Sequence, residues 1–181
     1  MTVLHLTAQD YKVSQWSGGT TTEIFIWPQG ANYATREFSL RISSATVELE
    51  ESDFTPLHGV MRYIVPLQGS FTLTHPDGEP VMMMPLDTPY RFSGQIPTHC
   101  VGKATDFNLM LKGVDGIMEI CTEQASILPG INCLYAPHGS EVTLSDQHYL
   151  LAAGDSLLIQ GEDTGVATIS AGPIIRCHST L

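Results

Sequence analysis

The chain has 181 residues and a mass of 19.7 kDa, which is enough for one large or two small domains with a sizeable core. Its 19 acidic and 8 basic residues give a net charge of -11 and a pI near 4.8, and such a field argues against nucleic acid and anionic membrane surfaces as partners. The four cysteines form no CxxC pair, no signal-like N-terminus is present and no apolar run is long enough to span a membrane, a combination typical of a cytoplasmic protein with reduced thiols.

Short strands predominate among the predicted elements. Sixteen glycines and 11 prolines divide the sequence at regular intervals, and no helical periodicity extends over three turns. Residues 113–129 are the least regular part, where we expect a short helix or a crossover. The last strand, residues 173–178, is expected to pair back with the N-terminal part of the chain. The sequence therefore predicts an all-β fold.

A tryptophan and a double glycine precede a Thr-rich strand near the N-terminus. Trp16 is followed by Gly18 and Gly19, and the strand then carries Thr21 and one acid, Glu23. The backbone amides of such a turn can approach a ligand closely. A surface hairpin with β-branched threonines is the plainer interpretation. Both interpretations stay open from this stretch alone.

Two later strands carry polar side chains opposite an apolar face. Arg41 alternates with apolar residues in one of them, and Asp106 and Asn108 do so in the other. Arg41 faces either solvent or the inside of a barrel. Asp106 and Asn108 are expensive to bury unless they are paired. They therefore face water, or meet Arg41 and Arg62 in a cavity.

Residues 59–73 have the pattern of a β-hairpin with an arginine in its first strand. Arg62 enters an apolar strand, Gly69 marks the turn, and the strand that follows alternates. The same order recurs in the second half of the chain, with Asn132 and Gly139 at the matching places. The aspartate that follows each turn glycine also recurs, although its spacing from the glycine is two positions shorter in the second copy. We predict two copies of one β-module.

The repeated module resembles a bicupin, with double-stranded β-helix (jelly-roll) modules expected over residues 1–112 and 113–181. In metal-binding cupins the strand before the turn carries histidines and then a glutamate. Arg62 stands at the glutamate position and Asn132 at its equivalent, while His58 alone matches a metal histidine. Because arginine stays protonated and cannot ligate, the resemblance implies a site without metal, and no other cofactor is expected.

In its details the sequence resembles the HutD/Ves family of cupin-like proteins. The matching motifs keep their order through Trp16, Gly18, Gly19, Thr21, Glu23, Ile24, Phe38, Arg41, Ser43, Phe54, Gly59, Arg62, Asp106, Phe107, Asn108 and Met110. The family usually has an asparagine and three glycines after the tryptophan, whereas this chain has Ser17 and two glycines. One branch of the family is associated with histidine utilisation and another with stress, and the sequence favours neither.

We expect a polar pocket in the N-terminal module that binds a small carboxylic acid. Arg62, helped by Arg41, would pair with the carboxylate, because a guanidinium can donate two parallel hydrogen bonds to it. Asp106 and Asn108 would orient the arginines or contact an amide or amine of the ligand. The candidate ligand-binding set is completed by Trp16, Thr21, Glu23 and His58. The resemblance suggests N-formylglutamate or a similar acid as the ligand, in a regulatory or sensing role.

Two other classes of function stay open. A metal-independent cupin isomerase or lyase would use Glu23, Asp106 or His58 as general base, although no Ser-His-Asp or Cys-His arrangement supports a catalytic assignment. A structural protein would hold Arg41, Arg62 and Asp106 in a buried ion network, or associate as a homodimer through a sheet face.

Overall fold

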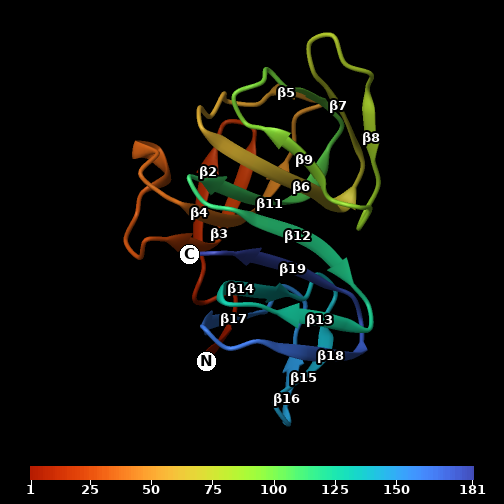
Figure 1. Cartoon of the computed structure of the whole chain (residues 1–181). Helices are drawn as coiled ribbons and strands as arrows, with labels where there is room; N and C mark the ends of the chain where they lie inside the picture. The colour runs from red at the N-terminus through yellow and green to blue at the C-terminus, as the bar shows by residue number, and fades with distance from the viewer. The chain divides into compact units, whose positions relative to one another are not determined.

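The structure, a computed structural model, describes residues 1–181 and consists almost wholly of β-strands (Figure 1). The one helical element is a short 3-10 turn, η1 (Tyr33–Thr35), which Asn32 caps by accepting a hydrogen bond from the Ala34 amide. The all-β prediction is confirmed. Residues 113–129 contain strands instead of the short helix considered from the sequence.

The chain forms two compact units, which we call the N-terminal unit (Lys12–Gly113) and the C-terminal unit (Met1–Tyr11 with Val114–Leu181). The predicted modules, 1–112 and 113–181, differ from these units in the placement of the first eleven residues and of Gly113. The first eleven residues join the C-terminal unit because β1 (Thr2–Leu6) pairs antiparallel with β17 (Ser156–Gly161). Sequence periodicity defines a strand but not its partner, so this placement had no sequence signal.

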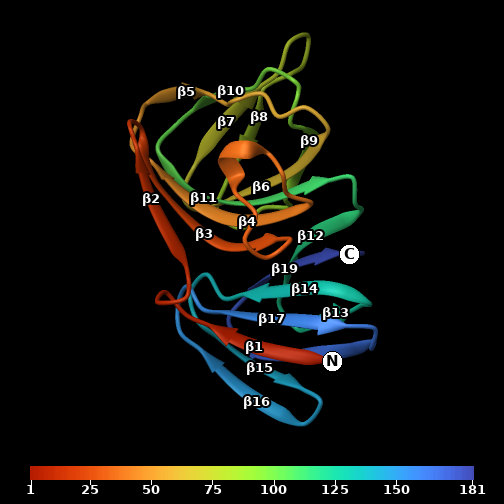
Figure 2. The same cartoon turned by 90° about the vertical axis from the view of Figure 1, so that its left-hand side faces the viewer.

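The N-terminal unit contains two antiparallel sheets. The six-stranded sheet has the order β2 (Lys12–Trp16), β3 (Gly19–Trp27), β4 (Leu40–Val47), β11 (Ala104–Lys112), β6 (Val60–Gly69) and β9 (Tyr90–Ser93). The four-stranded sheet has the order β5 (Glu51–Asp53), β10 (His99–Val101), β7 (Phe71–Thr74) and β8 (Val81–Met83). Figure 2 shows β3, β4 and β11 side by side in the larger sheet.

The C-terminal unit repeats this arrangement. Its five-stranded sheet has the order β1, β17, β14 (Gly130–Tyr135), β19 (Ile174–Ser179) and β12 (Gly116–Cys121). Its four-stranded sheet has the order β13 (Gln124–Ile127), β18 (Gly165–Ala171), β15 (Ser140–Leu144) and β16 (Gln147–Leu151). The last strand, β19, pairs with β12 and β14 of its own unit, so the expected pairing with the N-terminal module is wrong.

Each unit has its own apolar core, to which both of its sheets contribute. The buried core residues of the N-terminal unit include Ile64, Phe71, Leu73, Met83, Phe92, Cys100 and Ala104. Those of the C-terminal unit include Ile127, Leu134, Val142, Leu144, Leu151, Leu157, Ile159 and Ile169. Burial of these side chains is the main favourable term in folding each unit.

The strand order of the two units supports duplication of one module. The series β4-β11-β6-β9 has its counterpart in β12-β19-β14-β17, and β5-β10-β7-β8 in β13-β18-β15-β16. One backbone contact is repeated as well: the Leu86 amide donates to the Pro66 carbonyl at 3.0 Å, and the Gly154 amide to the Ala136 carbonyl at 2.8 Å. The two carbonyl groups, of Pro66 and Ala136, are 70 residues apart, whereas the two amides, of Leu86 and Gly154, are 68 apart. The sequence repeat has the same two-residue difference after its turn glycine.

The segment predicted as a hairpin is a crossing between sheets. β6 lies in the six-stranded sheet and β7 in the four-stranded sheet, and β14 and β15 are separated in the same way. Gly69 and Gly139, with φ of 75° and 87°, make the two turns. The hairpin prediction is therefore wrong, because a strand that crosses to the facing sheet has the same alternation as one that folds back. The sheets of each unit also remain open and do not close into a barrel.

Candidate functional site

A cavity of about 420 Å³ lies in the N-terminal unit. Strands β2, β3, β4, β6 and β11 of the larger sheet contribute to its lining, together with η1, β5 and the two residues after β5. The lining residues are Ser14, Trp16, Thr21, Tyr33, Arg41, Ser43, Ala45, Val47, Ser52, Asp53, Phe54, Thr55, Arg62, Asp106, Asn108 and Met110. Both sheets of the unit thus contribute to the cavity wall.

Strand register places the two arginines on one row across the sheet. Arg41 on β4 and Arg62 on β6 both pair with Met110 on the strand between them. Side chains at alternate positions of a strand share a face, so Asn108 and Asp106 follow Met110 on the cavity side of β11. The sheet therefore presents two guanidinium groups, an amide and a carboxyl group to one cavity.

Arg62 is a buried cation without a carboxylate partner. The residue is 7% exposed, and Nη2 donates to Asn108 Oδ1 at 3.0 Å. Its Nε is buried without any hydrogen-bond partner. The guanidinium carbon lies 4.6 Å from the ring centroid of Phe54 and 5.3 Å from that of Phe92, which stabilises the cation in part. Burial lowers the pKa of Arg62, and Asp106 opposes that shift.

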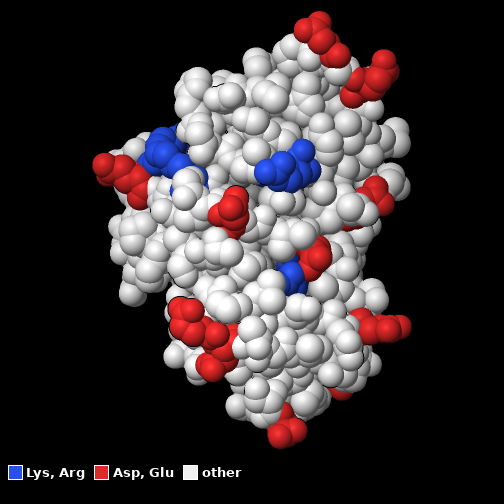
Figure 3. Space-filling view, viewed as in Figure 1, with Lys and Arg blue, Asp and Glu red and all other residues white.

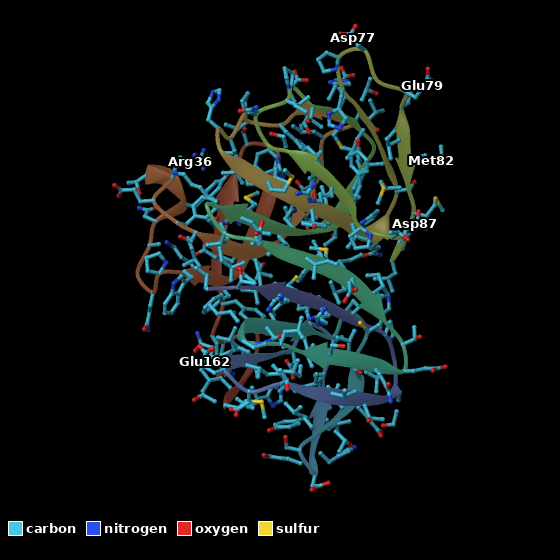
Figure 4. All side chains as sticks on the ribbon, viewed as in Figure 1. Arg36, Asp77, Glu79, Met82, Asp87 and Glu162 are labelled. Atoms are coloured by element: carbon cyan, nitrogen blue, oxygen red, sulfur yellow. The ribbon has the colours of Figure 1, made fainter.

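Arg41, in contrast, has a carboxylate partner within the unit. Its Nε donates to Glu23 Oε2 at 2.7 Å and its Nη1 to Ser43 Oγ at 3.1 Å. A β-bulge in β3 follows Glu23, whose register partner is Ser43. The Tyr33 ring lies 4.1 Å from the Arg41 guanidinium and 4.0 Å from that of Arg36, which Figure 4 shows beside η1. The charge of Arg41 is thus already neutralised by Glu23.

Asp106 is a buried carboxyl group at the end of a hydrogen-bonded chain. Asn108 Nδ2 donates to Asp106 Oδ1 at 2.5 Å, while Asn108 Oδ1 accepts from Arg62, so the amide links the two groups. The Asp106 side chain is 5% exposed. Burial raises its pKa to about 7, against the opposing effects of Arg62, the Asn108 hydrogen bond and the Ala45 backbone. Near neutral pH its carboxylic acid and carboxylate forms are therefore both populated.

The structure brings most of the predicted site residues together. Arg62, Arg41, Asp106, Asn108, Trp16 and Thr21 line the cavity. Glu23 contacts it indirectly, through its ion pair with Arg41. His58 is exposed in the loop before β6 and is outside the lining.

The double glycine after Trp16 allows the Trp16 ring and the backbone of β4 to pack closely against this turn. A Cβ at Gly18 would lie 2.2 Å from the Trp16 ring, and one at Gly19 would lie 1.8 Å from the Thr46 carbonyl oxygen. Neither glycine lines the cavity, whereas Trp16 does. The Gly-Gly turn thus positions the tryptophan at the cavity, which differs from the expected approach of its amides to a ligand.

Ten lining residues were not predicted as site residues, and among them Ser43, Phe54 and Tyr33 contact the guanidinium groups. Ser43 shares a face with Arg41 because it lies two positions further along β4, and this alternation could have identified it. Phe54 and Tyr33 lie against the two guanidinium groups. They come from a loop and from η1, where no periodicity shows which way a side chain points.

The residues at the cupin metal position do not fit a metal ion. A protonated, buried guanidinium stands where a cupin has its glutamate ligand, and it would repel a cation. The one candidate histidine, His58, lies outside the cavity lining. No three His, Cys, Asp or Glu side chains of the chain are grouped as a metal site requires. The chemistry of this cavity instead suits an anion.

The chain is similar to solved structures of bacterial proteins. A conserved protein of unknown function from Pseudomonas aeruginosa PAO1 has a TM-score of 0.85 and 23% identity, with 100% of both chains covered. HutD from Pseudomonas fluorescens SBW25, solved in a formate condition, has a TM-score of 0.83 and 22% identity, with 99% of this chain and 98% of that chain covered. The pirin YhhW from Escherichia coli, in complex with nickel(II), has a TM-score of 0.66 and 11% identity over 97% of both chains.

These structural matches show the cupin-like fold. Among curated proteins, none matches the chain. None of the elements is a helix of the length and apolarity needed to cross a membrane. The HutD family model matches residues 8–175, which is most of the sequence, and the chain therefore belongs to the HutD family.

Proposed function

We propose that the protein binds a small carboxylic acid in the cavity of its N-terminal unit and acts as a sensor or regulator, not as a metal-dependent cupin enzyme. The observation that carries this proposal is the buried guanidinium of Arg62 in the cavity lining, which has no carboxylate partner and whose Nε has no hydrogen-bond partner. A buried charge without a partner destabilises a fold by several kcal/mol. A carboxylate bound at Arg62 would remove that penalty and would pair with the guanidinium through charge-assisted hydrogen bonds.

The cavity has the size and composition of a small-ligand site. About 420 Å³ is within the range of small-molecule pockets. Phe54 and Met110 offer apolar contact, while Arg62 and Asn108 offer polar contact. On the face of the molecule shown in Figure 3, acidic groups outnumber basic ones. An anion would therefore be attracted by the local arginine and not by the overall field of the protein.

Family membership suggests which acids to test first. N-formylglutamate, an acid of histidine breakdown, is the first ligand to test, and the HutD structure in a formate condition makes formate a second one. A role in histidine utilisation would place the protein as a sensor of a pathway acid.

A metal-independent isomerase or lyase is a second candidate, and Asp106 is the observation that favours it. A carboxyl group whose pKa lies about 7 can act as a general base near neutral pH. It lines the same cavity as Arg62, which would hold the substrate carboxylate. Incubation of the acid in D2O with the protein, followed by NMR of the carbon-bound protons, would detect such proton abstraction; loss of an α-proton signal would favour an enzyme.

A thermal-shift screen of metal-stripped protein tests the binding proposal. The panel contains formate, acetate, succinate and N-formyl-L-glutamate, and the variants are Arg62→Met and the control Arg91→Met, because Arg91 is exposed on β9. A carboxylate that binds the native state raises the melting temperature by mass action. We expect this rise in the wild type and in Arg91→Met and its loss in Arg62→Met. An equal rise in Arg62→Met, or none in the wild type, would contradict the proposal.

A further inference from the structure

The charges that face the cavity do not balance once an anion is bound. Arg41 and Glu23 form an ion pair and cancel. Arg62 supplies one positive charge without a carboxylate partner, and Asp106 lines the same cavity. A carboxylate ligand neutralises Arg62, so an ionised Asp106 would then be a second, uncompensated anion inside the unit. Two anions in one desolvated site are strongly disfavoured unless one takes up a proton.

From this charge balance, and resting on the proposed function, we propose that the cavity takes up its carboxylate ligand together with one proton, which Asp106 holds. The geometry supports this role, because Asn108 links Asp106 to Arg62 through hydrogen bonds of 2.5 Å and 3.0 Å. Neutralising Arg62 removes the charge that most favours the Asp106 carboxylate over the carboxylic acid. The ligand and the proton therefore bind cooperatively, each raising the affinity for the other.

The other titratable groups around the cavity do not explain such uptake. From β4 and β3 come Arg41 and Glu23, which are paired with each other. From β10 comes Cys100, a thiol whose pKa is raised to about 12 by burial and by Asp106. From η1 comes Tyr33, which packs on Arg41 through its ring face. These groups leave Asp106 as the buried proton acceptor of the cavity.

One exposed pair near the cavity needs a control. Asp53 lines the cavity from β5 and is bonded at 2.8 Å to His99 of β10. That contact raises the pKa of His99 above its ordinary value, so proton uptake by this histidine has to be distinguished from uptake by Asp106. The Asp53 side chain is 86% exposed and that of His99 is 42% exposed, so a ligand at Arg62 should change their protonation little. The variants Asp53→Asn and His99→Gln show whether a proton taken up on ligand binding goes to this pair or to Asp106.

Isothermal titration calorimetry tests the proposal with N-formyl-L-glutamate as probe, or acetate where that acid does not bind. Titrations at pH 8 in two buffers of different ionisation enthalpy give the number of protons taken up. We expect uptake approaching one proton per ligand in the wild type, Asp53→Asn and His99→Gln, and none in Asp106→Asn. The Kd of the wild type should be nearly constant below pH 6.5 and should weaken up to tenfold per pH unit between about pH 7 and 9.

The outcomes separate this proposal from the proposed function. Binding without proton uptake at pH 8, or uptake that is lost in His99→Gln and kept in Asp106→Asn, would overturn proton coupling and leave carboxylate binding intact. Absence of binding between pH 5.5 and 9 would overturn both. Should Asp106→Asn fail to fold, carbon-13 NMR of the Asp106 carboxyl group in the wild type at pH 8 gives the answer: a shift to the protonated position on ligand addition supports the proposal, and no shift contradicts it.

Discussion

Arg62 differs from the other two buried arginines of the protein in having no carboxylate partner. Arg41 pairs with Glu23, and in the C-terminal unit Arg176 pairs with Glu119 at 2.5 Å. The charge of a paired arginine is compensated within the fold, whereas the buried charge of Arg62 has no carboxylate in contact with it. This difference between chemically identical side chains is the reason to place the carboxylate at Arg62.

Asp106 should make the stability of the protein depend on pH. Its pKa is raised from 3.8 in the unfolded chain to about 7 in the fold, so between these values the folded state binds more protons than the unfolded state. The stability that the protonated form provides is complete below pH 3.8 and is lost as the pH rises towards 7. In Asp106→Asn this loss is absent, so its free energy of unfolding relative to wild type should rise by a few kcal/mol from pH 4 to pH 8.

Urea unfolding of wild type and Asp106→Asn at pH 4 and pH 8 measures this effect. The control is Asp77→Asn, since Asp77 is exposed in the loop between β7 and β8 and should leave the pH dependence as it is in the wild type. A constant stability difference between wild type and Asp106→Asn at both pH values would show that Asp106 titrates at its ordinary pKa.

At the residue scale, the sequence predicted much of the site's composition but little of its pairing. Alternation put Arg41, Asp106 and Asn108 on the polar faces of apolar strands, and all three line the cavity. The sequence could not show that Glu23 would pair with Arg41 and leave Arg62 unpaired, since that depends on strand order and on the bulge in β3. His58 was selected from its spacing, which says nothing about the direction of a loop side chain.

At the scale of elements, the sequence repeat predicted the positions of the two glycine turns correctly. It predicted wrongly which strands pair after each turn. Gly69 ends β6 and Gly139 precedes β15, at equivalent places in the two units. Their turns lead to the facing sheet, where β7 and β15 pair with β10 and β18. Local patterns fix where a strand begins and ends, while strand partners depend on contacts between distant segments.

The two turn glycines should respond differently to substitution by alanine. Both have positive φ, which costs an alanine about 1 to 2 kcal/mol. A Cβ at Gly69 would also lie 2.5 Å from the Lys103 carbonyl oxygen, whereas at Gly139 the nearest atom is 3.3 Å away. We therefore expect Gly69→Ala to lower the free energy of unfolding by about 3 kcal/mol or more, and Gly139→Ala by less.

Gly30→Ala is the matched control, because Gly30 has φ of 86° and a Cβ at this position would have no atom within 4 Å. Chemical denaturation of the three variants would separate the loss of stability caused by positive φ from the loss caused by the close contact of the new Cβ. If Gly69→Ala were no less stable than Gly30→Ala, the close approach between β6 and the start of β11 would not hold.

At the scale of the whole molecule, the two units share a strand order but not the pair of arginines that lines the N-terminal cavity. Asn132, the equivalent of Arg62, is bonded through its amide to the backbone of Leu128. In the N-terminal unit, Met110 pairs with Arg41 on one side and with Arg62 on the other. In the C-terminal unit, His178 takes the place of Met110 and pairs with Ile117 and Asn132. The duplicated module thus kept its fold in both units, and the arginine-lined cavity is a feature of the N-terminal unit.

The first strand of the chain should be needed by the C-terminal unit. β1 covers the edge of β17, and His5 is bonded to Asp155 at 2.9 Å. Deletion of residues 1–6 would expose that edge, so amide hydrogen exchange in β17 should become faster while exchange in the N-terminal unit stays unchanged. Unchanged protection of β17 in the shortened protein would contradict the pairing. No sequence pattern predicted this contact, since strands from opposite ends of a chain give no local signal.

The most direct test of the account is a crystal structure of the metal-stripped protein grown with saturating N-formyl-L-glutamate or acetate. We predict a carboxylate in the N-terminal cavity with its oxygens within about 3.2 Å of the Arg62 guanidinium nitrogens, the ordinary limit for a hydrogen bond. A carboxylate bound away from Arg62, or a cavity that holds only ordered water at saturating acid, would contradict the central claim that this arginine is the anion-binding group of the protein.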